Sequence, residues 1–358
     1  MSRLSRRALV GGIAAGIASR TGVRRAAARR EPGPVPMPMP ATVRAIYLNP
    51  LATDAARMRD LFDLIDYTEI NALVIDVKED GLYVPTRVPL FLDAGEIDPG
   101  VLDAPALLGA LHERGVYAIA RVVTFRDAYI TRSRPDLAMI DRSTGQPWQS
   151  FDGLTWLNPL KDELWDAYRE FAVELVDLGF DEIQFDYVRF PSDGDMATLD
   201  AGTPLDDPLR TRTIAGFIGA CRDVIAPLGA TTAADIFGYT MLVDDIGIGQ
   251  NARLLGEQAD VLCPMVYPSH YPDYSINVPG TPNDYPYDVV AISLAEGATR
   301  VPSARLRPWL QDFSLAGMSD YGPTQVRAQI DAAEAAGAGG WMLWAADSVF
   351  TAGALAIG

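Results

Sequence analysis

The sequence predicts an α/β protein of the (β/α)8 barrel type, a TIM barrel, built as a single domain. From residue 43 onward, short runs rich in β-branched residues alternate with longer segments of helical periodicity, which implies parallel strands joined by helices. Eight such units fit into about 310 residues, the size of a closed barrel. An open doubly wound sheet is the alternative, but no glycine-rich phosphate-binding turn follows the first strand.

The elements are expected in a regular order along the chain. Each strand is a short apolar run, and each helix is a longer segment in which apolar residues recur every three or four positions. The eight strands are expected at 43–49, 72–78, 116–125, 182–190, 230–237, 260–267, 305–313 and 340–346. The helices between them are expected at 54–67, 104–113, 163–178, 208–225, 252–258, 287–296 and 324–336. Glycine follows several of these helices, as at Gly179 and Gly337, which is typical of a left-handed C-cap.

Long loops follow strands three, four and six of this series. They comprise residues 127–161, 191–207 and 268–286. All three lie on the carboxyl-terminal side of their strands, where barrel enzymes place their active sites. A functional site is therefore expected at this end of the barrel.

The first 30 residues have the composition of an export signal. They contain eight arginines and no acidic residue, and the pair Arg6-Arg7 precedes a short apolar stretch over residues 8–18. This pattern resembles a twin-arginine signal, so we expect residues 1–30 to direct export to the periplasm, the cell surface or the medium. A basic tail or an uncleaved anchor helix is the alternative. Residues 31–42, with five prolines, are expected to form an extended spacer before the barrel domain at 43–358.

The overall composition excludes several classes of protein. Of the 358 residues 49% are hydrophobic, which is too apolar for a disordered chain, and no apolar run reaches the ~18 residues of a membrane span. We therefore expect no stable membrane insertion once the signal is removed. The net charge of −17 argues against nucleic acid as a partner, because a phosphate-binding face needs clustered Lys and Arg. Cys221 and Cys263 are expected to be buried thiols.

Polar residues occur on the strand face that should line the barrel. Alternate residues of a strand face the helices or the interior, and the apolar set Leu73, Ile75 and Val77 should face the helices. The same alternation predicts the following residues inside: Tyr47, Asp76, Lys78, Arg121, Glu182, Gln184, Asp186, Asp235, Tyr267, Trp309 and Gln311. Buried charges are costly unless they are paired, so each of these charges needs a partner or a function.

Four of these charged residues have two interpretations. Asp76, Lys78, Arg121 and Glu182 either close the barrel as a buried ion network or contact a substrate. The network is favoured for Glu182, which lies near the start of its strand, and for Arg121.

Asp186 and Asp235 are the candidate catalytic residues. They lie near the carboxyl ends of neighbouring strands, which are ~4.8 Å apart. Glycosidic hydrolysis needs one carboxyl group to protonate the leaving oxygen and a second to act as nucleophile or to activate water, and a separation of ~5–5.5 Å is associated with retention. Crowding two acids raises one pKa, so we assign Asp186 as nucleophile and Asp235 as acid/base. Asp312 is out of phase with Gln311 and reaches the site only if its strand has already ended.

The sequence offers little for other reactions. With only His112 and His270 it cannot form a multi-histidine zinc site, and it contains neither a G-x-S-x-G motif nor a P-loop. Asp76, Glu79 and Asp80 could form a carboxylate site for Mg²⁺ or Ca²⁺, but Lys78 would compete with the metal ion for these carboxylates. We therefore expect no metal and no cofactor.

Aromatic residues gather on the carboxyl-terminal side of the predicted barrel. Their rings offer large apolar faces, which suit the apolar faces of pyranose rings. The candidates are Trp148, Trp156, Tyr267, Tyr271, Tyr274, Tyr285, Tyr287, Trp309 and Trp344. Each one alone is as consistent with loop packing, but together they favour a carbohydrate ligand.

Five segments of the sequence together carry a resemblance to a known family. They cover residues 75–78, 179–191, 234–238, 264–271 and 307–313, and the most specific are the runs Phe-Asp-Tyr-Val-Arg-Phe-Pro and Pro-Met-Val-Tyr-Pro-Ser-His-Tyr. Over residues 43–350 the chain resembles the family called putative glycosyl hydrolase domain. The resemblance implies a TIM barrel related to the α-amylase-like glycosidases. It also implies that Asp186 is the nucleophile and Asp235 the proton donor, a position where those relatives usually carry Glu.

We therefore expect an exported glycoside hydrolase that cleaves O-glycosidic bonds of a poly- or oligosaccharide by a retaining two-carboxylate mechanism. The residues expected to bind the sugar are Asp76, Lys78, Arg121, Gln184, Arg189, Tyr267, His270, Trp309, Gln311, Asp312 and Trp344. The alternatives are a non-catalytic carbohydrate-binding barrel and a barrel hydrolase that uses a metal. The sequence leaves the sugar and the oligomeric state open.

Overall fold

The computed structural model describes residues 33–358 except for residues 80, 96–97, 99 and 302–304. The predicted export signal at 1–30 lies outside the described residues. The described part of the proline-rich segment, residues 33–40, has no helix or strand and contacts the barrel. Met37 and Met39 pack against the residues that fill the barrel interior, and the Met37 amide donates a hydrogen bond of 2.7 Å to Asp181.

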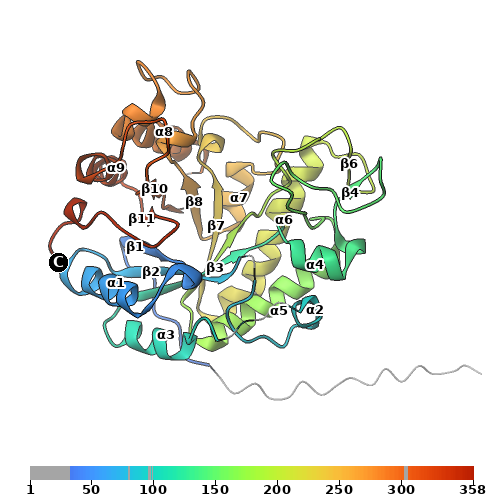
Figure 1. Cartoon of the computed structure of the whole chain (residues 1–358), viewed down its shortest axis with the longest axis horizontal. Coiled ribbons are helices and arrows are strands. Elements are labelled where there is room, and N and C mark those ends of the chain that lie inside the picture. Colours follow the sequence, from blue (N-terminus) through green and yellow to red (C-terminus); the bar gives the residue numbers. More distant parts are fainter. Residues whose placement is uncertain (1–32, 80, 96–97, 99, 302–304) are drawn as a thin grey trace, which may run out of the picture. The chain divides into compact units, whose positions relative to one another are not determined.

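Parallel strands form a closed barrel, which confirms the predicted fold (Figure 1). The strands in chain order are β1 Val43–Leu48, β2 Ala72–Lys78, β3 Tyr117–Val123, β5 Glu182–Asp186, β7 Thr231–Phe237, β8 Val261–Met265, β9 Arg305–Leu306, β10 Trp309–Gln311 and β11 Gly340–Trp344. Their order in the sheet is β10-β11-β1-β2-β3-β5-β7-β8-β9, and the pairing of β10 with β8 closes the ring.

The seventh barrel strand is divided, whereas the sequence predicted one continuous strand. β9 and β10 are separated by Arg307 and Pro308. Proline has no N–H group to donate to the neighbouring strand, so it interrupts the ladder at this point. β9 therefore pairs with β8, while β10 pairs mainly with β11.

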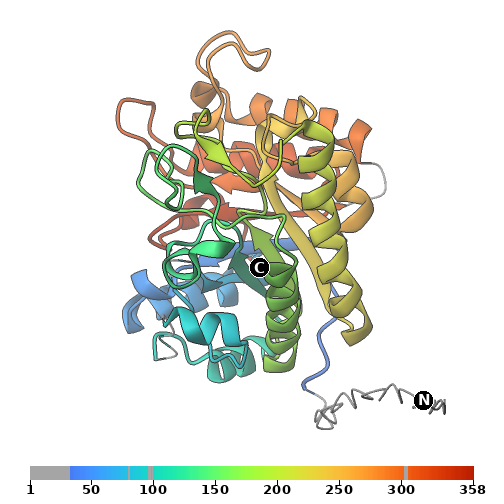
Figure 2. The same cartoon turned by 90° about the vertical axis from the view of Figure 1, so that its right-hand side faces the viewer.

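The seven predicted helices are present, each within a few residues of its predicted ends, and they surround the strands (Figures 1 and 2). They are α1 Ala55–Tyr67, α3 Ala104–His112, α5 Asp162–Leu178, α6 Asp207–Ile225, α7 Ala252–Gln258, α8 Pro286–Arg300 and α9 Pro323–Ala335. Gly179 ends α5 in the left-handed conformation, with φ of 116°, as its C-cap position requires. Among the described residues, no helix is long and apolar enough to cross a membrane.

Several short elements in the loops were not predicted. Two are helices, α2 Pro89–Ala94 and α4 Ala128–Ser133, and two are strands, β4 Ile140–Asp141 and β6 Leu199–Asp200. β4 and β6 pair antiparallel and so join the long loops that follow β3 and β5. The 3-10 helices are η1 Pro50–Ala52, η2 Pro135–Leu137, η3 Ala226–Leu228, η4 Gly238–Met241, η5 Pro268–His270, η6 Pro282–Asp284 and η7 Ala352–Ala354.

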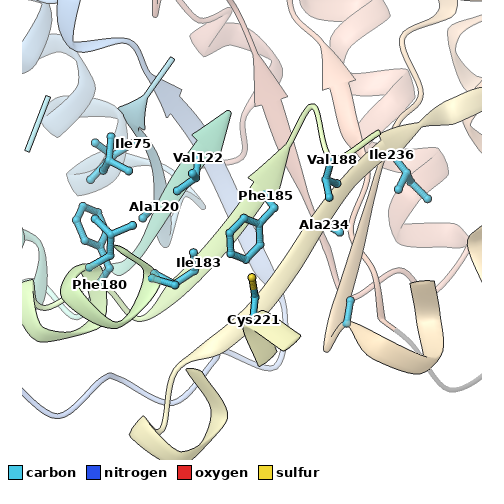
Figure 3. Packing of buried hydrophobic residues seen from close by; sticks show 14 of the residues in the cluster. Ile75, Ala120, Val122, Phe180, Ile183, Phe185, Val188, Cys221, Ala234 and Ile236 are labelled. Carbon is cyan, nitrogen blue, oxygen red and sulfur yellow. The ribbon is translucent and has the colours of Figure 1, made fainter. Parts of the chain in front are cut away.

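The strands separate two hydrophobic cores, as the alternation of residues predicts. Between strands and helices lies the larger cluster, which includes Ile75, Ile183 and Phe185. Figure 3 shows Cys221 of α6 directed towards Phe185. Inside the barrel lies a smaller cluster that includes Val74 and Cys263. Both cysteines are buried free thiols, as predicted.

An ion pair occupies the interior near the start of the strands. Glu182, the first residue of β5, pairs with Arg307, and both side chains are almost completely buried. Removing one partner of such a pair typically costs about 3–5 kcal/mol, because the other charge is left buried and uncompensated. Glu182 therefore has the structural role that the sequence favoured, with a partner that the sequence did not predict.

Candidate active site

A cavity of about 360 Å³ opens at the carboxyl ends of the strands, where the sequence predicted the site. Residues from β3, β5, β7, β8, β10 and β11, and from the loops after β2, β5, β7 and β8, form its wall. They are Glu79, Arg121, Asp186, Tyr187, Arg189, Phe237, Gly238, Tyr239, Met265, Tyr267, His270, Tyr271, Trp309 and Trp344. The cavity combines aromatic rings with two carboxylates and two guanidinium groups.

Asp186 is the last residue of β5, and its side chain is held from two sides. Its Oδ2 accepts hydrogen bonds from Arg121 Nε at 3.0 Å and Nη2 at 2.6 Å. Its Oδ1 accepts one of 2.5 Å from the Tyr187 amide. Asp186 is 6% exposed and lines the cavity. This carboxyl group therefore has a counter-charge, a fixed orientation and access to a ligand.

Arg121 of β3 connects this carboxylate to a second one deeper in the barrel. Its Nη1 donates a 2.5 Å hydrogen bond to Asp76 Oδ1, and Tyr47 donates to the other oxygen of Asp76. Burial raises the pKa of Asp76 to about 8, although the charge of Arg121 opposes this shift. Asp76 is fully buried and does not line the cavity, so it positions Arg121 and is not placed to touch a ligand.

Asp235 of β7 is in a different environment from Asp186. Its Oδ1 accepts a 2.8 Å hydrogen bond from Trp309 Nε1, whereas its buried Oδ2 has no hydrogen-bond partner. Burial, and then the charge of Asp186, raise the pKa of Asp235 well above its usual range. Both effects favour the protonated form of Asp235. It is 1% exposed and is not part of the cavity wall, whereas its neighbours Trp309 and Arg121 are.

The two candidate catalytic carboxyl groups are close together. In the register of β5 and β7, Phe185 lies opposite Ala234, so the next residues, Asp186 and Asp235, follow side by side. Arg121 Nε lies 3.0 Å from Asp186 Oδ2 and 4.0 Å from Asp235 Oδ2, so the two oxygens are no more than about 7 Å apart. This limit for one pair of oxygens is compatible with the carboxyl separation associated with retention.

Lys78 does not face the barrel interior, so this prediction is wrong. The register between β2 and β3 shifts between Asp76 and Lys78, which reverses the alternation at the end of β2. Lys78 Nζ donates instead to Asp127 Oδ2 at 2.6 Å and to the Val123 carbonyl at 3.1 Å. Its ammonium group lies over the ring of Phe91, which belongs to the core between strands and helices. Lys78 is therefore not placed to bind a sugar in the cavity.

Three other predicted ligand residues lie outside the cavity wall. Gln184 is buried beneath the cavity, where Nε2 donates to the sulfur of Met342 at 3.5 Å. Gln311 accepts a 3.0 Å hydrogen bond from the Ser269 amide and so holds the loop that carries His270. Asp312 accepts hydrogen bonds from the Thr351 amide and hydroxyl and is not on the cavity wall, although β10 has already ended at Gln311.

The remaining predicted ligand residues do line the cavity. Tyr267, His270, Trp309 and Trp344 surround it together with Arg121 and Arg189. His270 contacts the Ser269 hydroxyl through Nδ1 at 3.0 Å, and burial lowers its pKa, so it is neutral at neutral pH.

Two aromatic candidates have structural roles. Trp148 and Trp156 are each 1% exposed and pack in the hydrophobic core rather than on the cavity wall. Tyr274, by contrast, is 95% exposed in the loop after β8. Only some of the aromatic residues on this side of the barrel therefore line the cavity.

Several wall residues were not predicted, because their positions depend on strand ends. Glu79 follows the irregular end of β2 and was considered only as a metal ligand. Tyr187 would face the helices with Ile183 and Phe185 if β5 continued its alternation, but its φ of 49° turns the chain at the end of β5. Gly238 lies where β7 and β8 approach closely, since a Cβ atom there would come within 2.4 Å of the Met265 carbonyl oxygen.

No group of three or more potential metal-binding His, Cys, Asp or Glu residues occurs in the part of the chain that the structure describes. Asp80, one of the three carboxylates considered for Mg²⁺ or Ca²⁺, lies outside the described residues. Asp76 is committed to Arg121 and Tyr47. The two carboxyl groups on the cavity wall, those of Glu79 and Asp186, both lie near the guanidinium group of Arg121.

A closed parallel barrel with two carboxyl groups at the carboxyl ends of neighbouring strands is an arrangement characteristic of barrel glycoside hydrolases. The chain belongs to the family described as putative glycosyl hydrolase domain, which matches residues 45–350. The family and the fold together place the protein among the glycoside hydrolases, as the sequence predicted. No curated protein sequence matches the chain significantly.

Solved structures with the same fold include several glycoside hydrolases. The glycoside hydrolase domain of PgaB (BpsB) from Bordetella bronchiseptica has a TM-score of 0.59 at 14% identity, covering 86% of this chain and 94% of that one. A β-galactosidase from Marinomonas ef1 has a TM-score of 0.60 at 13% identity, covering 85% and 54%. A chitinase from Chromobacterium violaceum has a TM-score of 0.51 at 15% identity, covering 87% and 96%. At these identities the similarity concerns the fold.

Proposed function

We propose that this protein hydrolyses O-glycosidic bonds of a poly- or oligosaccharide with retention of configuration, using Asp186 as nucleophile and Asp235 as acid/base. The observation that carries the proposal is the contrast between these two neighbouring carboxyl groups. Asp186 is paired with Arg121 and reaches the cavity, whereas Asp235 is buried, with a raised pKa and one unpartnered oxygen. A retaining glycosidase needs one ionised and one protonated carboxyl group in this relation.

The reaction would take place in two displacements. In the first, a carboxylate oxygen of Asp186 bonds to the anomeric carbon while the glycosidic C–O bond breaks and the proton of Asp235 passes to the leaving oxygen. In the second, Asp235 takes a proton from water, and the resulting hydroxide displaces Asp186 from the sugar. Arg121 holds Asp186 in position throughout, and Trp309, Trp344, Tyr267 and His270 would contact the sugar rings.

The burial of Asp235 sets a condition on this mechanism. Asp235 does not line the cavity, so either the neighbouring Trp309 moves when the sugar binds or one water molecule carries the proton. The same burial favours the second candidate function, a carbohydrate-binding barrel without catalytic activity.

An assay on a panel of oligo- and polysaccharides distinguishes the two functions. We expect cleavage of at least one member, unaffected by a metal chelator, and a first product with the anomeric configuration of the substrate when it is followed by NMR. Products of inverted configuration would contradict the assignment of Asp186 as nucleophile. Binding without cleavage across the whole panel would favour the non-catalytic barrel, and loss of activity with chelator would favour a metal-assisted hydrolase.

We also infer that the protein is exported through a twin-arginine route, because Arg6-Arg7 precedes a short apolar stretch. Replacing both arginines by lysine is expected to retain the full chain inside the cells of a bacterium with this export system. Cell fractionation with an antibody against the barrel would test this, with the unchanged chain as control. Equal export of the two chains would exclude the twin-arginine route.

A further inference from the structure

Arg189 is a buried cation on the cavity wall without an acidic partner. It is 5% exposed, and among the described residues no carboxylate lies within ion-pair distance of its guanidinium group. The other guanidinium groups of this region do have acidic neighbours. Arg121 pairs with Asp76 and Asp186, and Arg126 lies 3.8 Å from Glu79. Because an unpaired buried charge is costly, Arg189 requires an explanation.

Aromatic rings hold the guanidinium group of Arg189 in place. Its central carbon lies 4.6 Å from the centre of the Phe237 ring, 4.7 Å from Trp156 and 5.1 Å from Tyr187. Such contacts favour a cation over a ring face and restrict the rotation of the planar group. Burial lowers the pKa of Arg189 to about 10, so the group still carries its charge at neutral pH.

The guanidinium group of Arg189 donates hydrogen bonds within the protein through one nitrogen, Nη1, and its other two nitrogens are free to bind a ligand. Nη1 donates to the Phe190 carbonyl oxygen at 3.1 Å and to the Ser192 hydroxyl at 3.2 Å. Nε and Nη2 have no hydrogen-bond partner among the described residues. Neither atom is fully enclosed, and the side chain lines the cavity. The Nε/Nη2 edge presents two parallel N–H groups, whose geometry matches a carboxylate.

We propose that Arg189 binds the carboxylate of a uronic acid unit, so that the substrate is an acidic saccharide. The inference rests on the proposed function for the saccharide nature of the ligand. The carboxylate would accept hydrogen bonds from Nε and Nη2 and supply the missing counter-charge. The sugar ring itself would lie in the aromatic cavity beside Asp186. A sulfate ester also offers oxyanions, but it lacks the planar shape of the carboxylate.

Binding is best measured on the full chain carrying Asp186→Asn, which is expected not to cleave its ligand. Oligoglucuronate and oligogalacturonate would each be compared by calorimetry with the same oligosaccharide after reduction of its carboxyl groups, and with a sulfated neutral oligosaccharide. We expect at least one uronate to bind about 10- to 100-fold more tightly than its reduced form. Equal affinity for the acidic and reduced forms would overturn the proposal without any variant of Arg189, and tightest binding of the sulfated sugar would overturn the assignment to a carboxylate.

Substitution of Arg189 then tests whether this residue is responsible for the preference for acidic over neutral oligosaccharides. In the same background, Arg189→Gln is expected to bring the ratio of uronate to neutral affinity close to one, and Arg189→Lys to leave an intermediate ratio. Arg169→Gln, which removes an exposed charge from α5, is the control for net charge. A ratio unchanged by Arg189→Gln in a folded protein would overturn the proposal.

The outcomes also separate this inference from the proposed function. A preference for uronates in the binding assay, without cleavage by the unmodified protein, would support Arg189 as the carboxylate-binding residue and contradict the hydrolase. Cleavage of neutral glycans without a preference for uronates would support the hydrolase and contradict the role of Arg189 in binding a carboxylate.

Discussion

Asparagine in place of Asp186 is expected to lower kcat at least about a thousandfold on any glycan that the protein cleaves. The amide is a poor nucleophile, so the covalent intermediate cannot form. Its one acceptor oxygen can accept from Arg121 or from the Tyr187 amide, but not from both. The size and shape of the amide match those of the carboxyl group. The substrate should therefore bind with nearly unchanged affinity. Kinetics and calorimetry on the same preparation would measure the two effects separately.

Asp181 offers a matched control for this substitution. It is a buried aspartate that directly precedes β5, at the other end of the strand from Asp186, and it accepts hydrogen bonds from the Met37 and Ala118 amides. Asp181→Asn should lower the melting temperature, because an amide nitrogen would face an N–H donor, but it should leave kcat unchanged. Full activity of Asp186→Asn, or equal loss in both variants, would contradict the proposed nucleophile.

Asp235→Asn is expected to lower kcat about 10²- to 10⁴-fold for natural glycosides, which need a general acid to protonate the leaving oxygen. Aryl glycosides with acidic leaving groups need no such proton, so the first step on these substrates should be much less affected. Burial and the charge of Asp186 raise the pKa of Asp235, which favours the protonated acid. Activity of the unmodified protein should fall as pH rises through this pKa, and the variant should lack that alkaline limb.

Trp309→Phe tests whether Asp235 causes the alkaline limb of the pH profile, because it changes the surroundings of Asp235 and leaves the carboxyl group in place. The indole N–H donates to Asp235 Oδ1, a hydrogen bond that favours the carboxylate and lowers the pKa. Its loss should move the alkaline limb of the pH profile to higher pH. An alkaline limb that persists in Asp235→Asn, or stays in place in Trp309→Phe, would assign the proton donor to another residue, of which Glu79 is the nearest candidate on the cavity wall.

The barrel and most of the cavity could be predicted because they depend on local patterns. Alternation along β2 and β5 separates Ile75 and Ile183, which face the helices, from Asp76 and Asp186, which face inwards. The prediction failed where a strand departs from regular geometry. At the end of β2 the register shift carries Lys78 out of the barrel, and at the end of β5 the turn at Tyr187 brings its ring to the cavity.

The pairing of buried charges could not be predicted. The expected single network is divided into three parts: Asp76 and Asp186 on Arg121, Lys78 on Asp127, and Glu182 on Arg307. Asp127 lies in a loop, and Arg307 lies where Pro308 interrupts the seventh strand. Neither position has a regular periodicity from which the direction of its side chain could be inferred.

The amino-acid sequence by itself determined the order of the strand–helix units of the barrel, the inner face of most strands and the two acids at neighbouring strand ends. These features follow from the spacing of apolar residues, which is a relation between neighbours along the chain. Only the tertiary structure decided that Asp235 is buried and bonded to Trp309, that Asp186 is held by Arg121 and that Arg189 has no acidic partner among the described residues. These depend on distances between residues far apart in the sequence and on the exclusion of water around them, neither of which is encoded in any short segment.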